Sequence, residues 1–355
     1  RAEALFRQLA ARFSEHRMGH QARWRAAWVR WRRGHHAEAE ASFAEGAKAP
    51  GANSYAAANL FWAARAAERN GGEARVRAYL EAAAQQHPLT FYGQQARARL
   101  GLSHYRMPHA PVDLDNVPLP ATPATRHEEL AALGFDLDAL AEAEYVHDTL
   151  PAGHEHNEQV EIHRFLARTH HRLGNIRASV GNAEGVTWYL AHRRQPVDRE
   201  LWMLSYPRAY WDMISDTARR FGVDPRLVLA LIREESRFDA QAVSPAGAVG
   251  LMQLMPFTAR RMAAQLGLPP GWSSTDPRAN VLMGTAYLAG VIRDWNGDVA
   301  LALANYNAGP DAVRRWVGGG IGDRDLFLET IPYLETRFYV QKVLESYGIY
   351  RALWP

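Results

Sequence analysis

The stretch LALIREESRFDAQAVSPAGAVGLMQLMP, residues 229–256, carries two adjacent glutamates, Glu234 and Glu235, in a largely apolar segment. A helix start precedes it, because Asp224 can cap free amide groups and Pro225 suits the first helical position. Further helical segments follow, separated by turns rich in glycine, proline and asparagine, and no segment alternates convincingly as a strand. This part of the chain is therefore predicted to be a mainly α-helical domain.

The two glutamates fall on different parts of the predicted helix. Because an α-helix turns by about 100° per residue, Glu235 lies near the centre of the apolar face and Glu234 toward its edge. Arg233 lies outside that face. We therefore expect Glu235 to point into the core or into a cleft, and Glu234 to reach water. The residues of the apolar face are Leu227, Val228, Leu231, Ile232 and Phe238.

A carboxyl group in apolar surroundings holds its proton more tightly, since burial disfavours the charged form and raises the pKa. Glu235 could then donate a proton to a leaving group near neutral pH. The alternative is a buried structural glutamate that is paired with an arginine or with backbone donors. The helical pattern alone leaves both interpretations open.

Composition limits the chemistry that this part of the chain can perform. The chain has no cysteine, and all 15 histidines lie at or before His192. A histidine base, a Ser-His-Asp triad or a histidine-bound metal is thus excluded from residues 193–355. Carboxylates, hydroxyl groups and arginines remain. The net charge is only +3, and we predict neither a nucleic-acid partner nor a membrane-spanning segment.

The residues after the glutamate pair are compatible with a ligand cleft. Gly247 and Gly250 allow tight turns and close approach of a ligand to the backbone. Ser244 and Gln253 place polar groups near a methionine pair that includes Met255. An apolar cleft with a few oriented polar groups suits a sugar polymer. The alternative is an ordinary helix–turn–helix core.

The first hundred residues are predicted to form paired helices like those of a tetratricopeptide-type α-solenoid. Trp24, Trp28 and Trp31 recur at helical spacing, which indicates packing between helices, with a ligand-stacking stripe as the alternative. The predicted helical segments are residues 22–34, 35–48, 53–72 and 73–88.

The middle of the chain is predicted to connect two helical parts. Five prolines in residues 103–127 indicate an extended linker, and helical patterns resume after it. The chain is accordingly predicted to be all-α, and its expected parts are a helical-repeat superhelix at 1–102, the proline-rich linker at 103–127, a small helical connecting domain at 128–206 and a catalytic domain at 207–355.

The segment HEHNE, residues 154–158, offers His154, His156 and Glu158 as metal ligands. Their spacing suits a loop more than one helix face, so we expect a solvated loop, with a metal site as the alternative. Three basic residues of the next helix are expected on a solvated face: Arg164, Arg168 and Arg172.

Three motifs, taken together, resemble the soluble lytic transglycosylases. EESRFDAQAVSPAGAVGLMQLMPFTA at 234–259 resembles the core motif of that family, with its ES pair followed by GLMQ and MP. ALANYNAGPDAVRRW at 302–316 is similar to the second motif, centred on YNAG, and LETIPYLETRFYVQKVL at 328–344 to the third. The motifs occur in the order of the family, and the resemblance covers residues 207–355. The helical N-terminal half resembles the superhelical part of large members only loosely.

The resemblance implies a lysozyme-like α-domain that cleaves the MurNAc–GlcNAc β-1,4 bond of peptidoglycan without adding water. Carried onto this chain, Glu235 is the acid and then the base, and Ser244 is the serine that orients the carboxylate and the substrate. Gln253 and Met255 match substrate-contacting positions, Tyr306 a tyrosine near the reaction centre, and Glu329 a glutamate that helps to bind sugar. No metal or organic cofactor is implied.

One inward-facing glutamate suffices if the substrate supplies the second group, whereas ordinary glycosidases use two carboxylates. The resemblance implies that Glu235 protonates the glycosidic oxygen and then takes the proton of the C6 hydroxyl, which closes a 1,6-anhydro ring. A lysozyme-type hydrolase is the alternative enzyme. A non-catalytic helical scaffold that binds glycan is the alternative of another class.

The resemblance also implies a place in the cell. Peptidoglycan strands as substrate indicate the periplasm of a Gram-negative bacterium, with outer-membrane association of the precursor and cell-wall synthesis or remodelling proteins as candidate partners. The chain opens with RAEALFRQLAARF, which we interpret as following a removed leader or a cut. Only about 200 residues precede the catalytic domain. The arm is therefore expected to be shorter than in large members or cut at its N-terminus, and a complete ring is not predicted.

Overall fold

The computed structural model describes residues 1–108, 112–114, 124–150 and 156–354. These residues form 19 α-helices, and among them extended backbone pairs only in isolated bridges between Val243, Val249 and Leu254. The predicted all-α class is therefore confirmed. The chain divides into two compact units: residues 1–108, 187–197 and 354–355 form unit 1, and residues 109–186 and 198–353 form unit 2. None of the described helices has both the length and the apolar character that a bilayer crossing requires.

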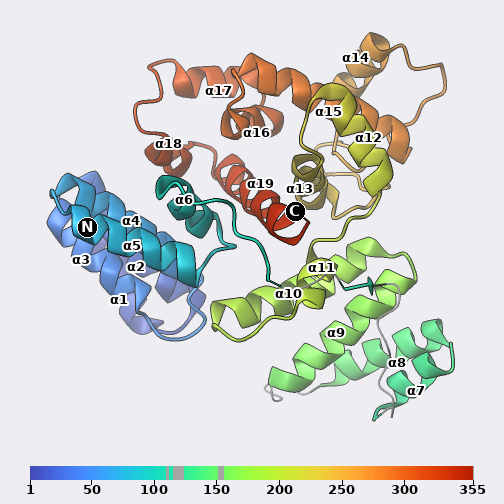
Figure 1. Ribbon diagram of the computed structural model, residues 1–355, viewed down its shortest axis with the longest axis horizontal. Helices are drawn as coiled ribbons and strands as arrows, with labels where there is room; N and C mark the ends of the chain where they lie inside the picture. Colours follow the sequence, from blue (N-terminus) through green and yellow to red (C-terminus); the bar gives the residue numbers. More distant parts are fainter. Residues whose placement is uncertain (109–111, 115–123, 151–155, 355) are drawn as a thin grey trace. The chain divides into compact units, whose positions relative to one another are not determined.

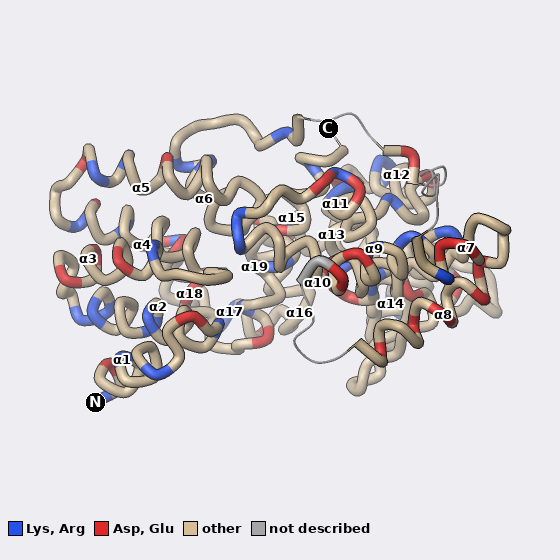
Figure 2. Tube along the Cα trace, turned by 90° about the horizontal axis from the view of Figure 1, so that it is seen from below, with Lys and Arg blue, Asp and Glu red and all other residues tan. Residues whose placement is uncertain are grey.

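Unit 1 is a stack of helices in which each packs on the next along the chain (Figure 1). Acidic and basic positions are interspersed along its helices (Figure 2). The first six helices are α1 (Ala2–Arg12), α2 (Arg17–Arg32), α3 (His36–Ala47), α4 (Ala56–Arg69), α5 (Glu73–Gln86) and α6 (Phe91–Arg99).

A tryptophan cluster fills the interior of this stack. Trp24 stacks on Trp28 with ring centroids 5.4 Å apart, and Trp28 stacks on Trp31 at 5.3 Å. Trp62, from α4, forms a T-shaped pair with Trp28, with ring centroids 4.5 Å apart. All four side chains are buried, and the spacing of Trp24, Trp28 and Trp31 turns these three toward the neighbouring helices. The packing interpretation of Trp24, Trp28 and Trp31 is thus confirmed, and the ligand-stacking alternative is wrong.

Unit 2 begins with helices that follow the proline-rich segment. In that segment the described residues 103–108, 112–114 and 124–125 contain no α-helix. Thr125 and Glu128 form a reciprocal capping box, which explains why a helix starts at Arg126. The helices are α7 (Arg126–Ala132), α8 (Asp136–Thr149), α9 (His156–Arg172), α10 (Ile176–His192, whose last residues belong to unit 1) and α11 (Arg199–Ser205).

The basic residues of α9 are paired, so the prediction of a solvated face is wrong for Arg164, Arg168 and Arg172. Arg164 donates to Asp198, and Arg172 donates to Asp136 over 2.7 Å. Arg168 forms a bidentate ion pair with Glu200. All three side chains are largely covered, at 16%, 25% and 22% exposed. The carboxylates lie 32 to 36 residues away in sequence, beyond the reach of a helical pattern.

The HEHNE segment lies partly outside the described residues, and His154 is among those outside. The helix α9 starts at His156, so the end of the motif is helical and not a loop. Within the described part of the chain, no three His, Asp or Glu residues are placed to hold a metal ion.

The second part of unit 2 holds the glutamate pair. Its central helix is α13, and α13 packs along α19. Asp224 caps α13 by accepting from Arg226 N, and Pro225 occupies the first helical turn, as predicted. The helices are α12 (Trp211–Phe221), α13 (Pro225–Ser236), α14 (Pro256–Leu266), α15 (Pro277–Asp294), α16 (Val299–Ala308), α17 (Pro310–Val317), α18 (Arg324–Thr330) and α19 (Leu334–Leu353).

The loop between α13 and α14 is held by buried polar groups. Asn280, on α15, is wholly buried; its Nδ2 donates to Val249 O and Ser274 O, and its Oδ1 accepts from Met252 N. Ser236, the last residue of α13, donates through Oγ to Leu251 O over 2.8 Å. Since buried polar groups need partners, these bonds define one arrangement of the loop.

Two glycines of this loop have left-handed backbone but different surroundings. Gly250 has φ +82°, and a Cβ added there would lie 2.3 Å from Ser274 O and 2.4 Å from Asn280 Nδ2. Gly247 has φ +84°, and no described atom outside its immediate neighbours lies within 4 Å of such a Cβ. Gly250 is therefore required by both conformation and space, and Gly247 by conformation alone.

We expect Gly250→Ala to lower the free energy of unfolding by at least about 3 kcal/mol, because it adds overlap with backbone to left-handed strain. Gly247→Ala is the matched control and should cost only about 1–2 kcal/mol, the left-handed penalty alone. Urea unfolding followed by tryptophan fluorescence measures both. Equal losses in the two variants would contradict the steric account.

Candidate active site

Glu235 lies at the C-terminal end of α13 and points into the domain, as the helical pattern predicted, and there it meets α19. Tyr339 of α19 donates its hydroxyl hydrogen to Glu235 Oε1 over 2.7 Å. Burial raises the pKa of Glu235 to about 7, the hydrogen bond from Tyr339 opposes that rise, and the charges of Glu234 and Glu335 add to it. A carboxyl group with this pKa is present in both protonation states near neutral pH, as a proton donor and acceptor requires.

Tyr306 is the second aromatic hydroxyl near this carboxyl group. It comes from α16 and donates to Met252 O over 2.9 Å, and its ring lies 5.3 Å from that of Tyr287. Burial and the nearby Glu235 carboxylate raise the pKa of Tyr306 well above its usual value. Tyr306 therefore stays protonated and fixes the backbone of the loop beside Glu235.

The polar groups of Ser244 and Gln253 hold the loop itself. The Oγ of Ser244 accepts from Ala248 N over 3.0 Å. Gln253 has left-handed backbone, with φ 45°, and its Nε2 donates to Ala242 O and Gly250 O. These contacts give the two residues a structural part in the loop, and their contacts to a substrate remain predictions.

The other two predicted residues, Met255 and Glu329, differ from each other in exposure. Met255 precedes the first turn of α14 and is exposed, whereas Glu329, on α18, is buried. Gln341 of α19 donates to Glu329 Oε1 over 3.1 Å. Glu329 thus joins α18 to the helix that carries Tyr339, and its predicted role in sugar binding stays a prediction.

The expectation that Glu234 reaches water is wrong. Its Oε1 accepts from Arg233 Nη1 over 2.5 Å and from Ser346 Oγ over 2.6 Å, and only 11% of its side chain is exposed. Arg233 is itself buried, against the expectation from the apolar face. It pairs with Glu184 at 2.9 Å and lies over the Tyr206 ring at 4.0 Å. Partners from α10 and α19 compensate the burial of these charges, and the pattern of α13 alone does not contain those partners.

Reasoning from the sequence missed three residues that shape the site: Ser236, Asn280 and Tyr339. Ser236 and Tyr339 lie inside two of the motifs that carry the resemblance, so their positions were marked but their roles were not. Asn280 stands in an apolar helical segment, where a polar residue is a signal of a buried hydrogen-bonding role. Tyr339 contacts the carboxyl group of Glu235 directly, whereas Ser236 and Asn280 fix the adjacent loop through Leu251 and Met252.

Comparison with known proteins agrees with this arrangement. Residues 212–320 match the family model of the transglycosylase SLT domain. The soluble lytic murein transglycosylase of Salmonella typhimurium is 30% identical over 298 residues, which are 82% of this chain and 43% of that protein. That of Escherichia coli K12 matches over the same shares. This chain thus spans less than half the length of these relatives.

Solved structures show the same fold. A lytic transglycosylase Slt of Pseudomonas aeruginosa, solved as an inactive mutant, matches with a TM-score of 0.67 and 24% identity over 99% of this chain and 54% of that chain. The 70 kDa soluble lytic transglycosylase of Escherichia coli matches with a TM-score of 0.60 and 24% identity, over 99% and 61% of the two chains. The SLT family model and the two relatives confirm the resemblance stated from the three motifs, and the solved structures confirm the fold.

We expect Tyr339→Phe to raise the pKa of Glu235 by about one pH unit above its value of about 7, because the carboxylate loses a donated hydrogen bond. Titration of the glutamate carboxyl carbons by NMR measures this pKa. Tyr347→Phe is the matched control, since Tyr347 lies on the same helix but donates to Asp224 over 2.9 Å. A Glu235 pKa that rises equally in both variants would contradict the assignment.

We also expect Glu235→Gln to stabilise the fold in a pH-dependent way. The raised pKa means that the folded chain binds a proton that the unfolded chain releases between pH 4.5 and about 7, so wild-type stability falls as the pH rises through this window. Gln carries no such charge. The gain from the substitution should therefore grow by up to about 3 kcal/mol from pH 4.5 to pH 8, as measured by urea unfolding. A pH-independent difference would contradict it.

Proposed function

We propose that this chain, which carries a transglycosylase SLT domain at residues 212–320, is a peptidoglycan lytic transglycosylase. It cleaves the MurNAc–GlcNAc β-1,4 bond without water and leaves 1,6-anhydro-MurNAc ends, so it is a lyase. The observation that carries the proposal is the half-buried Glu235, whose pKa of about 7 suits one group for both giving and taking a proton. The relatives named lytic transglycosylases support it.

The proposed reaction uses one protein carboxyl group twice. Glu235, protonated, gives its proton to the glycosidic oxygen while the bond from C1 to that oxygen breaks. The N-acetyl carbonyl of the substrate stabilises the electron-poor C1. Glu235, now a carboxylate, then takes the proton of the C6 hydroxyl, and O6 bonds to C1. Atoms and charges balance, and Glu235 ends protonated as it began.

The surrounding residues have positioning parts in this proposal. Tyr339 holds Oε1 of Glu235 in place and limits the rise of its pKa, which keeps both protonation states accessible. Tyr306 fixes the Met252 carbonyl beside the carboxyl group. The fixed loop would present Ser244, Gln253 and the exposed Met255 to the glycan, with Glu329 supporting α18. The substrate would place the chain in the periplasm of a Gram-negative bacterium.

We expect Glu235→Gln to lower the release of soluble fragments from purified sacculi by about 10²–10⁴-fold, because an amide cannot donate and accept the proton. Mass spectrometry of the wild-type products should show anhydro ends. Reducing ends, a water's mass heavier, would instead support a lysozyme-type hydrolase.

The neighbouring residue supplies the control. Glu234→Gln should retain most of the turnover per folded molecule but melt at lower temperature, since buried Arg233 loses one of its carboxylates. If both variants lost activity equally while both stayed folded, the assignment of the proton transfers to Glu235 would be wrong.

A further inference from the structure

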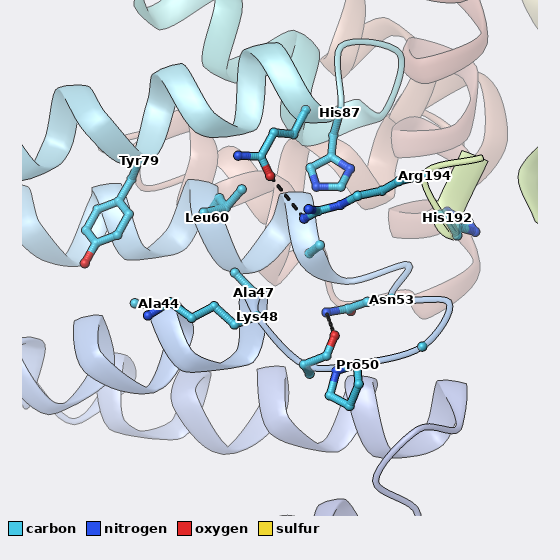
Figure 3. Close-up of a pocket in the computed structure, with 14 residues that line it drawn as sticks. Ala44, Ala47, Lys48, Pro50, Asn53, Leu60, Tyr79, His87, His192 and Arg194 are labelled. Carbon is cyan, nitrogen blue, oxygen red and sulfur yellow. Dashed lines mark hydrogen bonds between the residues drawn. The ribbon is translucent and has the colours of Figure 1, made fainter. Parts of the chain in front are cut away.

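Unit 1 contains a pocket that the proposed reaction does not use. Its volume is about 550 Å³, within the range of small-ligand sites. It lies between the end of α3, the loop that follows α3, the helices α4 and α5, and the turn after α10 (Figure 3). All of these segments belong to unit 1, so the pocket is complete within that unit.

The pocket has an apolar wall and cationic side chains. Alanines and Leu60 form the wall, and Lys48 and Arg194 bring positive charge to it. Arg194 uses one N–H to reach Gln86 Oε1 over 3.1 Å, and a guanidinium group has five such donors. The wall alanines are Ala44, Ala47, Ala49 and Ala56.

His87 supplies a buried polar atom that needs a partner. Its side chain is only 9% exposed, and its Nε2 is buried and has no hydrogen-bond partner among the described residues. Figure 3 shows its ring beside the side chain of Arg194 at the pocket. A buried ring nitrogen without a partner is unfavourable, and a bound polar ligand would supply one.

The charged side chains that line the pocket, Lys48 and Arg194, are both cationic, which favours an anion, and the histidines of the pocket add no charge at pH 7. Burial, with the charges of Arg194 and His192, lowers the pKa of His87 to about 4, so His87 is neutral at pH 7. Burial and the charge of Arg17 likewise lower the pKa of His192 to about 4. Glu40, the carboxylate near the pocket's Tyr79, is already paired with Arg75 at 2.7 Å.

We propose that this pocket binds a short acidic peptide with small side chains. Its carboxylate pairs with Arg194 and Lys48, a backbone or carboxyl group bonds to His87 Nε2, and methyl groups pack on the alanine wall. Bare phosphate would leave the apolar wall uncovered. The proposal does not depend on glycan cleavage; if the proposed function holds, the stem peptides of peptidoglycan have this chemistry.

The test measures binding to the full chain by calorimetry at low salt, without glycan, so its outcome is independent of cleavage. The probe is the tripeptide alanyl-glutamyl-alanine. Its uncharged counterpart, alanyl-glutaminyl-alanine amide, and inorganic phosphate are the comparison ligands. We expect the acidic tripeptide to bind at least about tenfold more tightly than either, a difference of about 1.4 kcal/mol in binding free energy.

Variants locate the binding. Arg194→Gln and Lys48→Gln, at exposed side chains, should each weaken tripeptide binding by about tenfold. Arg193→Gln is the matched control: it removes the same charge from the adjacent residue, whose guanidinium lies over the Tyr189 ring. His87→Phe should weaken binding while keeping the ring's volume. The proposal would be overturned if the tripeptide did not bind, or if phosphate or the uncharged peptide bound equally well. Equal effects of Arg193→Gln and Arg194→Gln would also overturn it.

Discussion

The side-chain amide of Asn280 satisfies three backbone groups at once, and the surroundings of Glu235 depend on it. It binds Val249 O and Met252 N, on either side of Gly250, and Ser274 O on a separate segment. A fully buried amide is stable only with its partners in place, so the loop has one low-energy arrangement. Ser236 and Tyr306 then bind the next two carbonyls, those of Leu251 and Met252. Backbone geometry thus fixes the wall beside the carboxyl group.

Two adjacent glutamates on one helix take opposite electrostatic roles. Glu234 is paired with Arg233 and Ser346, and that pairing balances a buried guanidinium group. Glu235 receives one hydrogen bond from a neutral tyrosine. Burial and neighbouring carboxylates raise its pKa, and no cation contributes to lowering it. The charge of Glu234 also raises the pKa of Glu235. The ion-pair network therefore contributes to the proton chemistry as well as to stability.

The sequence was informative where structure follows from local pattern. The start of α13 at Asp224 and Pro225 follows from capping, and the direction of Glu235 and of the tryptophans follows from helical spacing. The errors at Glu234, Arg233 and the arginines of α9 have another cause. Their partners are distant in sequence, as Ser346 is from Glu234 and Glu200 from Arg168. Helical periodicity treats such residues as solvent-facing because it cannot represent a counterion on another helix. For the same reason, the sequence pattern did not predict the role of Asn280 in holding the loop, since its three backbone partners come from two other segments.

Because the chain has only two lysines, the pocket of unit 1 can be labelled selectively by amine chemistry. Lys48 and Lys342 are the two lysines of the chain, and both are exposed. Of these, Lys48 lines the pocket, while Lys342 lies on α19 in the other unit. An amine-reactive label thus has two side-chain targets, one of which reports on the pocket and the other serves as an internal reference. Arginine, which supplies nearly all other positive charge, is inert to such reagents, so labelling can report occupancy of this pocket in the intact chain without any substitution.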